Sequence, residues 1–144
     1  MRPRPTAAWS PRALVALADA VCRARVTRVL GERGWQVEPH PSGFHLAGAL
    51  ERLVAGEATV PWPSLIVVDA ISAGCLGTTL AAGLRELEVP VPIVLVDANG
   101  HAAEDQARRI YTATPAIAPA VVAALAGDWP RPLLAASARR RDAA

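Results

Sequence analysis

The sequence predicts an α/β domain in which five parallel strands form a doubly wound sheet between two layers of helices. Short apolar segments alternate with helix-length segments five times along the 144 residues, which is typical of strand-helix units joined by right-handed crossovers. The runs LIVVD (65–69) and PIVLVD (92–97) are apolar without alternation, as in strands buried on both faces. Hydrophobic residues make up 52% of the chain and aromatic residues only 4%, so we expect a core of Ala, Val, Leu and Ile.

The predicted strands differ in how clearly their pattern marks them. RALVAL is a short apolar run, WQVEP alternates apolar and polar residues, and IYTA is a short segment of strand length. In chain order, the five strands are expected over 12–17, 35–39, 65–69, 92–97 and 110–113.

Two of the predicted helices have a clear apolar face. The helix over 19–34 ends at Gly34, and its apolar face consists of Cys22, Val26, Val29 and Leu30. The helix over 43–56 ends at Gly56, and its apolar face consists of Leu46, Leu50, Leu53 and Val54. Three further helices are expected over 77–87, 102–109 and 118–125, the second of them short and polar.

Basic residues gather at the two ends of the chain. Residues 1–12 carry three Arg, residues 128–144 carry four Arg and two Asp, and the middle carries eight Arg and eleven acids, so the body is mildly acidic. We expect one domain over 12–126, between a basic N-terminal tail (1–11) and a C-terminal tail (127–144) that holds Trp129. Such tails are usually solvated, so a nucleic-acid partner is disfavoured, although ARRR (138–141) offers a weak contact for an anionic partner.

Nothing in the sequence indicates a membrane segment or a secreted disulfide framework. No apolar run reaches the roughly 18 residues of a membrane-spanning helix, and the basic N-terminus is not followed by a long apolar segment. Cys22 and Cys75 lie far apart, without the spacing of a zinc site. We therefore expect a cytoplasmic protein without a membrane partner.

Chemistry in such sheets lies beyond the carboxyl ends of the strands. The residues expected there are Leu17 to Asp19, Asp69, Asp97 and Thr114. A phosphate-binding P-loop is excluded after Asp69, because SAGCLGTT has Ser72 in place of the first glycine and Thr78 in place of the lysine. All 15 basic residues in the Lys and Arg count are Arg, so no shifted alignment supplies a lysine.

Three segments match parts of one known family in order and spacing. LIVVDAISAGCLG (65–77) has a buried strand, an aspartate and a loop with Gly74 and Gly77, VPIVLVDA (91–98) has a second buried strand, and YTATP (111–115) has Tyr111 and Pro115. Together they resemble the third to fifth strands of the receiver domain of two-component response regulators, over about residues 12 to 126. The resemblance implies a flavodoxin-like, receiver-like fold.

The resemblance also assigns roles and shows which groups are missing. Receivers hold a divalent cation between acids after the first strand and the phosphoacceptor aspartate, and a lysine and a hydroxyl hold the phosphoryl oxygens. Asp69 is the phosphoacceptor-equivalent residue and Tyr111 matches the switch aromatic. The expected acid pair falls on Leu17 and Ala18, with Asp19 beside it, while Asp97 replaces the hydroxyl and Thr114 the lysine. The sequence therefore resembles a degenerate receiver, of the pseudo-receiver type.

The acids at this edge support two interpretations. Asp19 and Asp69, with Asp97, could hold a cation such as Mg²⁺, or the three carboxylates could share a solvated rim without metal, which we favour. If Asp69 and Asp97 approached within ~4 Å, they would repel by about 4 kcal/mol at an effective dielectric near 20, so one could keep a proton. A Tyr111 hydroxyl could donate a hydrogen bond to Asp97, or Tyr111 could be a half-buried tyrosine of an edge strand.

We interpret the chain as a non-catalytic signalling module without a cofactor. It would act by contact with another protein, such as a histidine kinase or a regulator, or with a second copy as a homodimer, through its fourth and fifth helices and fifth strand. The segment between Asp97 and Thr114 is shorter than in receivers, so the fourth helix should be stunted. One alternative is a phosphoacceptor response regulator phosphorylated on Asp69, and another is a sensor of a small molecule.

Overall fold

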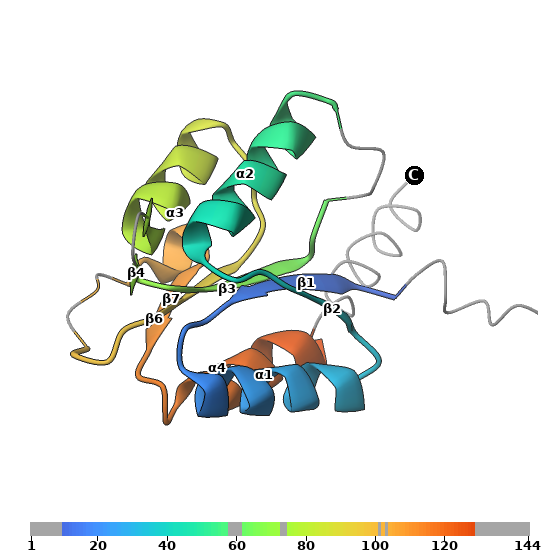
Figure 1. Ribbon diagram of the computed structural model, residues 1–144, viewed down its shortest axis with the longest axis vertical. Helices are drawn as coiled ribbons and strands as arrows, with labels where there is room; N and C mark the ends of the chain where they lie inside the picture. The colour runs from blue at the N-terminus through green and yellow to red at the C-terminus, as the bar shows by residue number, and fades with distance from the viewer. Residues whose placement is uncertain (1–9, 58–61, 73–74, 101, 103, 129–144) are drawn as a thin grey trace, which may run out of the picture.

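A computed structural model describes residues 10–57, 62–72, 75–100, 102 and 104–128, with only the backbone described at 72, 75, 76 and 128. Five parallel strands form one sheet in the order β2-β1-β3-β6-β7 (Figure 1). This order and the parallel pairing confirm the predicted doubly wound, flavodoxin-like sheet. The strands of the sheet are β1 (Arg12–Ala16), β2 (Gln36–Pro39), β3 (Leu65–Asp69), β6 (Ile93–Val96) and β7 (Ile110–Ala113).

Helices cover both faces of this sheet. In Figure 1, α2 and α3 lie on one side of the strands, and α1 and α4 lie together on the other. Their bounds are α1 (Ala20–Glu32), α2 (Gly43–Val54), α3 (Gly77–Glu86) and α4 (Ala118–Asp128). Gly34 and Gly56 follow α1 and α2 with φ of +78° and +73°, as the predicted helix ends require.

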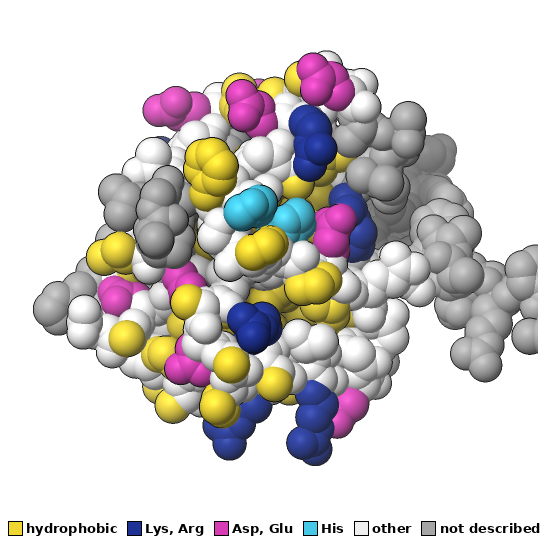
Figure 2. Space-filling model, in the orientation of Figure 1, with side chains coloured by type: hydrophobic (Ala, Val, Ile, Leu, Met, Phe, Trp, Pro, Cys, Tyr) yellow, Lys and Arg dark blue, Asp and Glu magenta, His cyan; other side chains and the backbone are white. Residues whose placement is uncertain are grey.

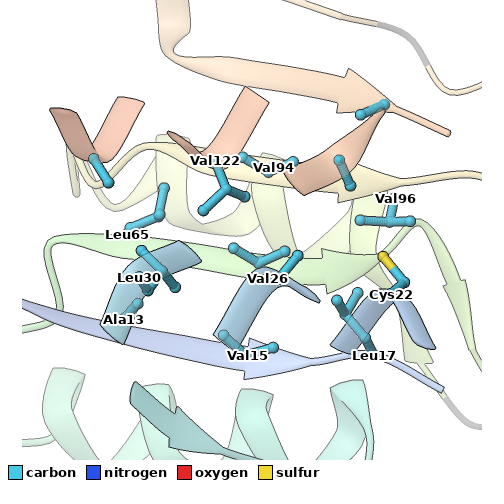
Figure 3. Close-up of a cluster of buried hydrophobic side chains, with 14 of the residues drawn as sticks. Ala13, Val15, Leu17, Cys22, Val26, Leu30, Leu65, Val94, Val96 and Val122 are labelled. Carbon is cyan, nitrogen blue, oxygen red and sulfur yellow. The ribbon is translucent and has the colours of Figure 1, made fainter. Parts of the chain in front are cut away.

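The core is divided by the sheet into two apolar clusters. On the α1 and α4 side, alternate residues of β1 and β6 pack against Cys22, Val26, Leu30 and Val122 of the helices (Figure 3). On the other side, the remaining residues of the central strands pack against Leu46 and Leu50 of α2 and against α3. The five residues of LIVVD are buried except Asp69, as the continuous apolar run predicts. Val54 is the exception on the predicted face of α2, since 46% of it is exposed.

Two segments differ from the prediction. The helix predicted over 102–109 is wrong, because only a 3-10 turn forms there, η2 (Gln106–Arg108). Asp105 and Ile110 exchange backbone hydrogen bonds of 2.9 Å on either side of this turn, which closes it after three residues. The segment after β3, predicted as a plain loop, contains a small antiparallel pair, β4 (Ile71–Ser72) and β5 (Cys75–Leu76). The expected shortening of the fourth helix is confirmed.

Both edges of the sheet have features that disfavour the addition of a further strand. At β7, the outward backbone groups of Ile110 pair with Asp105, and the Thr112 amide donates to the Glu104 carboxylate at 3.3 Å. At β2, Gln36 and His40 donate inward to Pro11 and Val15, so the alternate residue Pro39 faces outward, where it has no N–H to offer.

The described part of the chain contains no helix that is both long and apolar enough to cross a membrane. Of the predicted tails, only residues 10–11 and 127–128 belong to the described residues; Gly74 and Trp129 lie outside them.

Candidate functional site

The carboxyl end of β3 places Asp69 at the centre of the carboxyl edge of the sheet. Val96 of β6 is its partner on one side, and the segment after β1 lies on the other. The Ala18 amide donates a hydrogen bond of 2.8 Å to Asp69 Oδ2. The segment between β1 and α1 thus meets the carboxylate with a backbone N–H at the position where the resemblance leads us to expect acids.

The Asp69 carboxyl is half-buried, and its surroundings favour the protonated form. Burial raises the pKa of Asp69 above its ordinary value, the Ala18 amide opposes this, and the nearby charge of Asp19 raises it further. The neighbouring acid that perturbs the pKa of Asp69 is therefore Asp19.

A close approach of the main chain fixes the backbone of Asp69. A Cβ on Gly77 would lie 2.3 Å from the Asp69 carbonyl oxygen, so only glycine fits there. The Gly77 amide also donates to the Ala70 carbonyl at 2.9 Å, which joins the start of α3 to the end of β3. Close packing against the end of β3 thus explains why position 77, which matches the receiver pattern, is a glycine.

Asp19 is the N-cap residue of α1. Its Oδ1 accepts a hydrogen bond of 2.9 Å from the Cys22 amide, and its carbonyl accepts one from Arg23 at 2.9 Å. A carboxylate at a helix N-terminus is stabilising in itself, because it satisfies an amide and favours the positive end of the helix. Helix capping accounts for Asp19 without any metal.

Asp97 organises the loop that follows β6. Its carboxylate accepts hydrogen bonds from the amides of Asn99 (3.0 Å) and Ala102 (2.7 Å), and its carbonyl accepts one from Gly100. Asp97 is the buried polar residue among the described residues, with 8% exposed. The two carboxylate oxygens of Asp97 thus support the loop backbone at two amides. A Ser or Thr hydroxyl has one oxygen and could not replace both acceptors.

The remaining predicted positions contribute no charged group to this edge. Leu17 is buried in the core, and Ala18 is exposed. Thr114 is half-buried, and its carbonyl accepts the amides of Ile117 and Ala118. Tyr111 is half-buried and packs against the cluster on the α1 and α4 side. The Asp97 carboxylate accepts hydrogen bonds from the backbone amides of Asn99 and Ala102, and the predicted bond from the Tyr111 hydroxyl stays a prediction.

No group of three or more His, Cys, Asp and Glu side chains in the described part of the chain is arranged to hold a metal ion. Asp19 and Asp69 each have one carboxylate oxygen bonded to a backbone amide. The contact of the Ala18 amide with Asp69 could not be predicted from the sequence, because any residue type supplies a backbone amide. The cap role of Asp19 could have been predicted, because an Asp directly before a helix is a typical N-cap residue.

Four large exposed hydrophobic side chains follow the carboxyl ends of the strands, at the same edge of the sheet as Asp69. Val21 and Phe44 lie in the first turns of α1 and α2, Ile71 lies two residues after Asp69, and Ile117 directly precedes α4, with exposed fractions of 55–71%. All four positions belong to the carboxyl edge of the sheet. On the face shown in Figure 2, acidic and Arg side chains are interspersed and form no continuous basic stripe.

Solved structures with the same architecture are receiver domains. The phosphorylated cyanobacterial phytochrome response regulator RcpA aligns with a TM-score of 0.62 at 15% identity, over 83% of this chain and 94% of that one. The receiver domain of Francisella response regulator 1452 aligns with a TM-score of 0.57 at 17% identity, over 82% and 98% of the two chains. This chain has the receiver fold.

A further structure with the receiver fold is TrrA of Thermotoga maritima in complex with Mg²⁺ and BeF, with a TM-score of 0.55 at 21% identity over 72% of this chain and 86% of that one. No model of a protein family matches the sequence, and no curated protein matches it. The receiver fold is thus established by architecture, with low sequence identity.

Proposed function

We propose that this chain is a non-catalytic receiver-like signalling module that acts by binding another protein and does not require phosphorylation. The observation that carries the proposal is the environment of Asp69, whose Oδ2 accepts the Ala18 amide while burial and Asp19 raise its pKa. Phosphorylation of an aspartate adds negative charge that needs a cation and positive donors nearby. The chain has no lysine, and the acid at 97 is engaged with its own loop.

The exposed apolar residues at the same edge support binding of a protein. Val21, Ile71 and Ile117 are each more than half exposed at this edge, and exposed apolar side chains are typical of interaction surfaces. The fourth helix that we expected to share the partner surface is only the turn η2, so we place the partner at the carboxyl edge instead.

One experiment separates this function from phosphotransfer. The full chain is titrated with beryllofluoride and Mg²⁺ while its melting temperature is followed, beside a receiver domain that binds beryllofluoride in the same buffer. A ligand that binds the native state must raise the melting temperature. Because we expect beryllofluoride not to bind at Asp69, we expect no saturable rise. A saturable rise that disappears in Asp69→Asn would replace the proposal with its alternative, a phosphoacceptor response regulator.

The partner surface is tested by site-specific photo-crosslinking in cells that contain the proteins this chain meets in its natural host. A photoreactive residue at position 21 or 117 should give a discrete crosslinked protein. One at position 54 should give none, because Val54 lies at the far end of α2; it is a matched control, since it is also apolar and 46% exposed. Equal crosslinking from all three positions would contradict a partner at the carboxyl edge. A crosslinked product with the mass of two chains would identify the partner as a second copy.

A further inference from the structure

An apolar pocket lies at the opposite edge of the sheet, where β3, β6 and β7 begin. Its volume of about 790 Å³ is in the range of sites that accommodate a ligand or a short peptide segment. Trp62 forms part of its wall with 38% of its surface exposed, next to prolines that precede β3 and β6. The lining residues are Trp62, Pro63, Ser64, Glu88, Val89, Pro90, Val91, Pro92 and Arg109.

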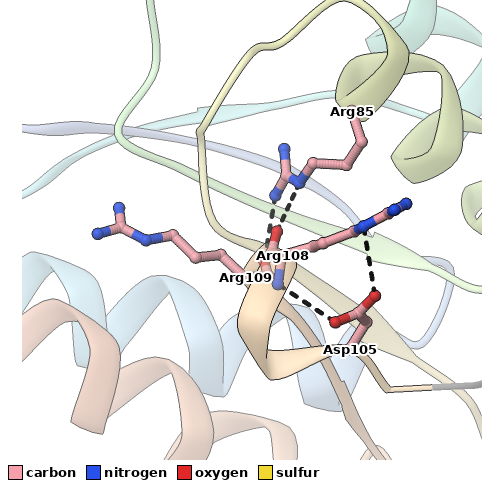
Figure 4. A network of polar contacts seen from close by, with 4 residues as sticks. All are labelled: Arg85, Asp105, Arg108 and Arg109. Carbon is pink, nitrogen blue, oxygen red and sulfur yellow. Dashed lines mark hydrogen bonds and ion pairs between the residues drawn. The ribbon is translucent and has the colours of Figure 1, made fainter.

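Arg85 holds two walls of this pocket together. Its guanidinium donates to the carbonyls of Val89 and Val91 in the segment before β6, and to those of Arg108 and Arg109 before β7 (Figure 4). Burial lowers the pKa of Arg85, and the neighbouring Arg109 lowers it further. A cation that spans four carbonyls keeps the pocket walls in place where a full fourth helix is lacking.

The backbone of the pocket wall is strained at two positions. Glu88 and Arg109 have φ of 58° and 59°, and they are the non-glycine residues with positive φ among the described residues. A left-handed conformation at such residues costs on the order of 1 kcal/mol each, and strain of this kind gathers at binding sites. Both strained residues line the same pocket.

The chain leaves the described fold at the edge that carries this pocket. Helix α4 follows the carboxyl end of β7 and runs back toward the edge where the strands begin (Figure 1). A Cβ on Gly127 would lie 4.0 Å from Nε of Arg33, the C-cap residue of α1 just before β2. Three strand spacings, about 14 Å, separate β2 from β6, and six extended residues reach roughly 20 Å.

The next six residues have the chemistry of the pocket. The sequence WPRPLL (129–134) supplies an aromatic anchor, two prolines and two leucines, and prolines lower the entropy lost on docking. Glu88 is exposed and lines the pocket with Arg109, and the segment with its continuation carries Arg131 and ARRR (138–141). A tethered segment also has an effective concentration near millimolar, which a separate peptide lacks.

We propose that residues 129–134 of this chain run to the pocket at the amino edge of its own sheet and dock there with Leu133 and Leu134 against Trp62 and the prolines. This contact does not depend on Asp69, so the state of the carboxyl edge and this docking can be tested separately.

The test is amide NMR spectroscopy of the full chain. The variant Trp129→Ala/Leu133→Ala/Leu134→Ala should shift the amide resonances of Trp62, Ser64, Glu88 and Arg109, and leave those of Ala18 and Asp69 in place. The control Ser137→Ala, in the same tail, should leave all of them in place. A Trp62→Ala chain should lose the response to the triple variant, because the wall that the segment contacts is removed.

Three outcomes would overturn the proposal. The first is an absence of shifts at the pocket in the triple variant. The second is a set of pocket shifts that appears with Trp9→Ala and not with the triple variant, which would identify the N-terminal segment as the occupant. The third is a response that disappears on dilution, which would mean that the segment comes from a second copy.

Discussion

At the scale of single residues, the approach of Gly77 to the Asp69 carbonyl makes a sharp prediction. The Cβ of Gly77→Ala would meet backbone atoms that cannot rotate away, so we expect a loss of about 1–3 kcal/mol in the free energy of unfolding. Urea denaturation of the full chain measures it. The matched control is Gly83→Ala in the same helix, which meets no atom within 4 Å and should gain about 0.5–1 kcal/mol.

The pKa of Asp69 makes a prediction about pH. Because burial raises this pKa in the folded state, folding favours the proton, and stability contributed by the protonated form is lost as pH rises through the folded pKa. Asp69→Asn keeps an acceptor for the Ala18 amide and has no charge to bury. We therefore expect Asp69→Asn to be more stable than the natural chain at pH 7, with the difference shrinking as pH falls through the folded pKa and smallest below the ordinary pKa of 3.8. A melting-temperature difference that is constant from pH 3 to 7 would contradict this.

At the scale of single elements, substitutions of Asp19 distinguish its role as a helix cap from a role as a metal ligand. Asp19→Ala should destabilise the fold by about 1 kcal/mol, while Asp19→Asn should have little effect, because Asn also accepts the Cys22 amide. Thermal unfolding with and without Mg²⁺ measures both variants. Stabilisation by Mg²⁺ that is lost in Asp19→Asn would show that the carboxylate charge, and not the cap, is what matters.

Arg85 is the side chain on which the segments before β6 and β7 depend most. Arg85→Lys keeps the charge but loses the planar fork that reaches four carbonyls, so we expect a loss of about 1–3 kcal/mol, measured by urea denaturation. Arg28→Ala is the control, since its contact with Glu32 is an exposed i,i+4 pair and should change stability by less than about 0.5 kcal/mol. Equal effects of the two substitutions would refute this role for Arg85.

The helices and strands that could be predicted are those with a clear hydrophobic pattern in the sequence. The strand LIVVD and the Cys22, Val26 and Leu30 face are confirmed, because burial on both faces or on one face leaves a periodic trace in the sequence. The helix over 102–109 was wrong because the antiparallel pairing of Asp105 with Ile110, five residues further along, outweighs helix propensity. The pair β4 and β5 was missed because two-residue strands leave no period.

The candidate site was predictable only in part. The strand order places Asp69 at the carboxyl edge, as the sequence indicated, but the Ala18 amide and the Arg85 carbonyl contacts depend on backbone atoms that no residue type announces. Two of the acids expected on the rim, Asp19 and Asp97, are bonded to backbone amides of their own segments.

At the scale of the whole molecule, the paired outward groups of β7 limit how copies can associate through that edge of the sheet. Glu104→Ala would expose the outward Thr112 amide, so we expect self-association to increase by up to roughly tenfold, the equivalent of one hydrogen bond. Sedimentation velocity over a range of concentrations measures it. Glu51→Ala removes the same charge from the exposed surface of α2 and should leave the sedimentation coefficient unchanged.

The two amides held by Asp97 set a condition for anyone who would build phosphoryl chemistry into this chain. Exchanging the acid for a hydroxyl would take away an acceptor from Asn99 or Ala102 in the same step. The residues between β6 and η2 would then have to be redesigned together with the reactive group, so that the loop keeps acceptors for both amides.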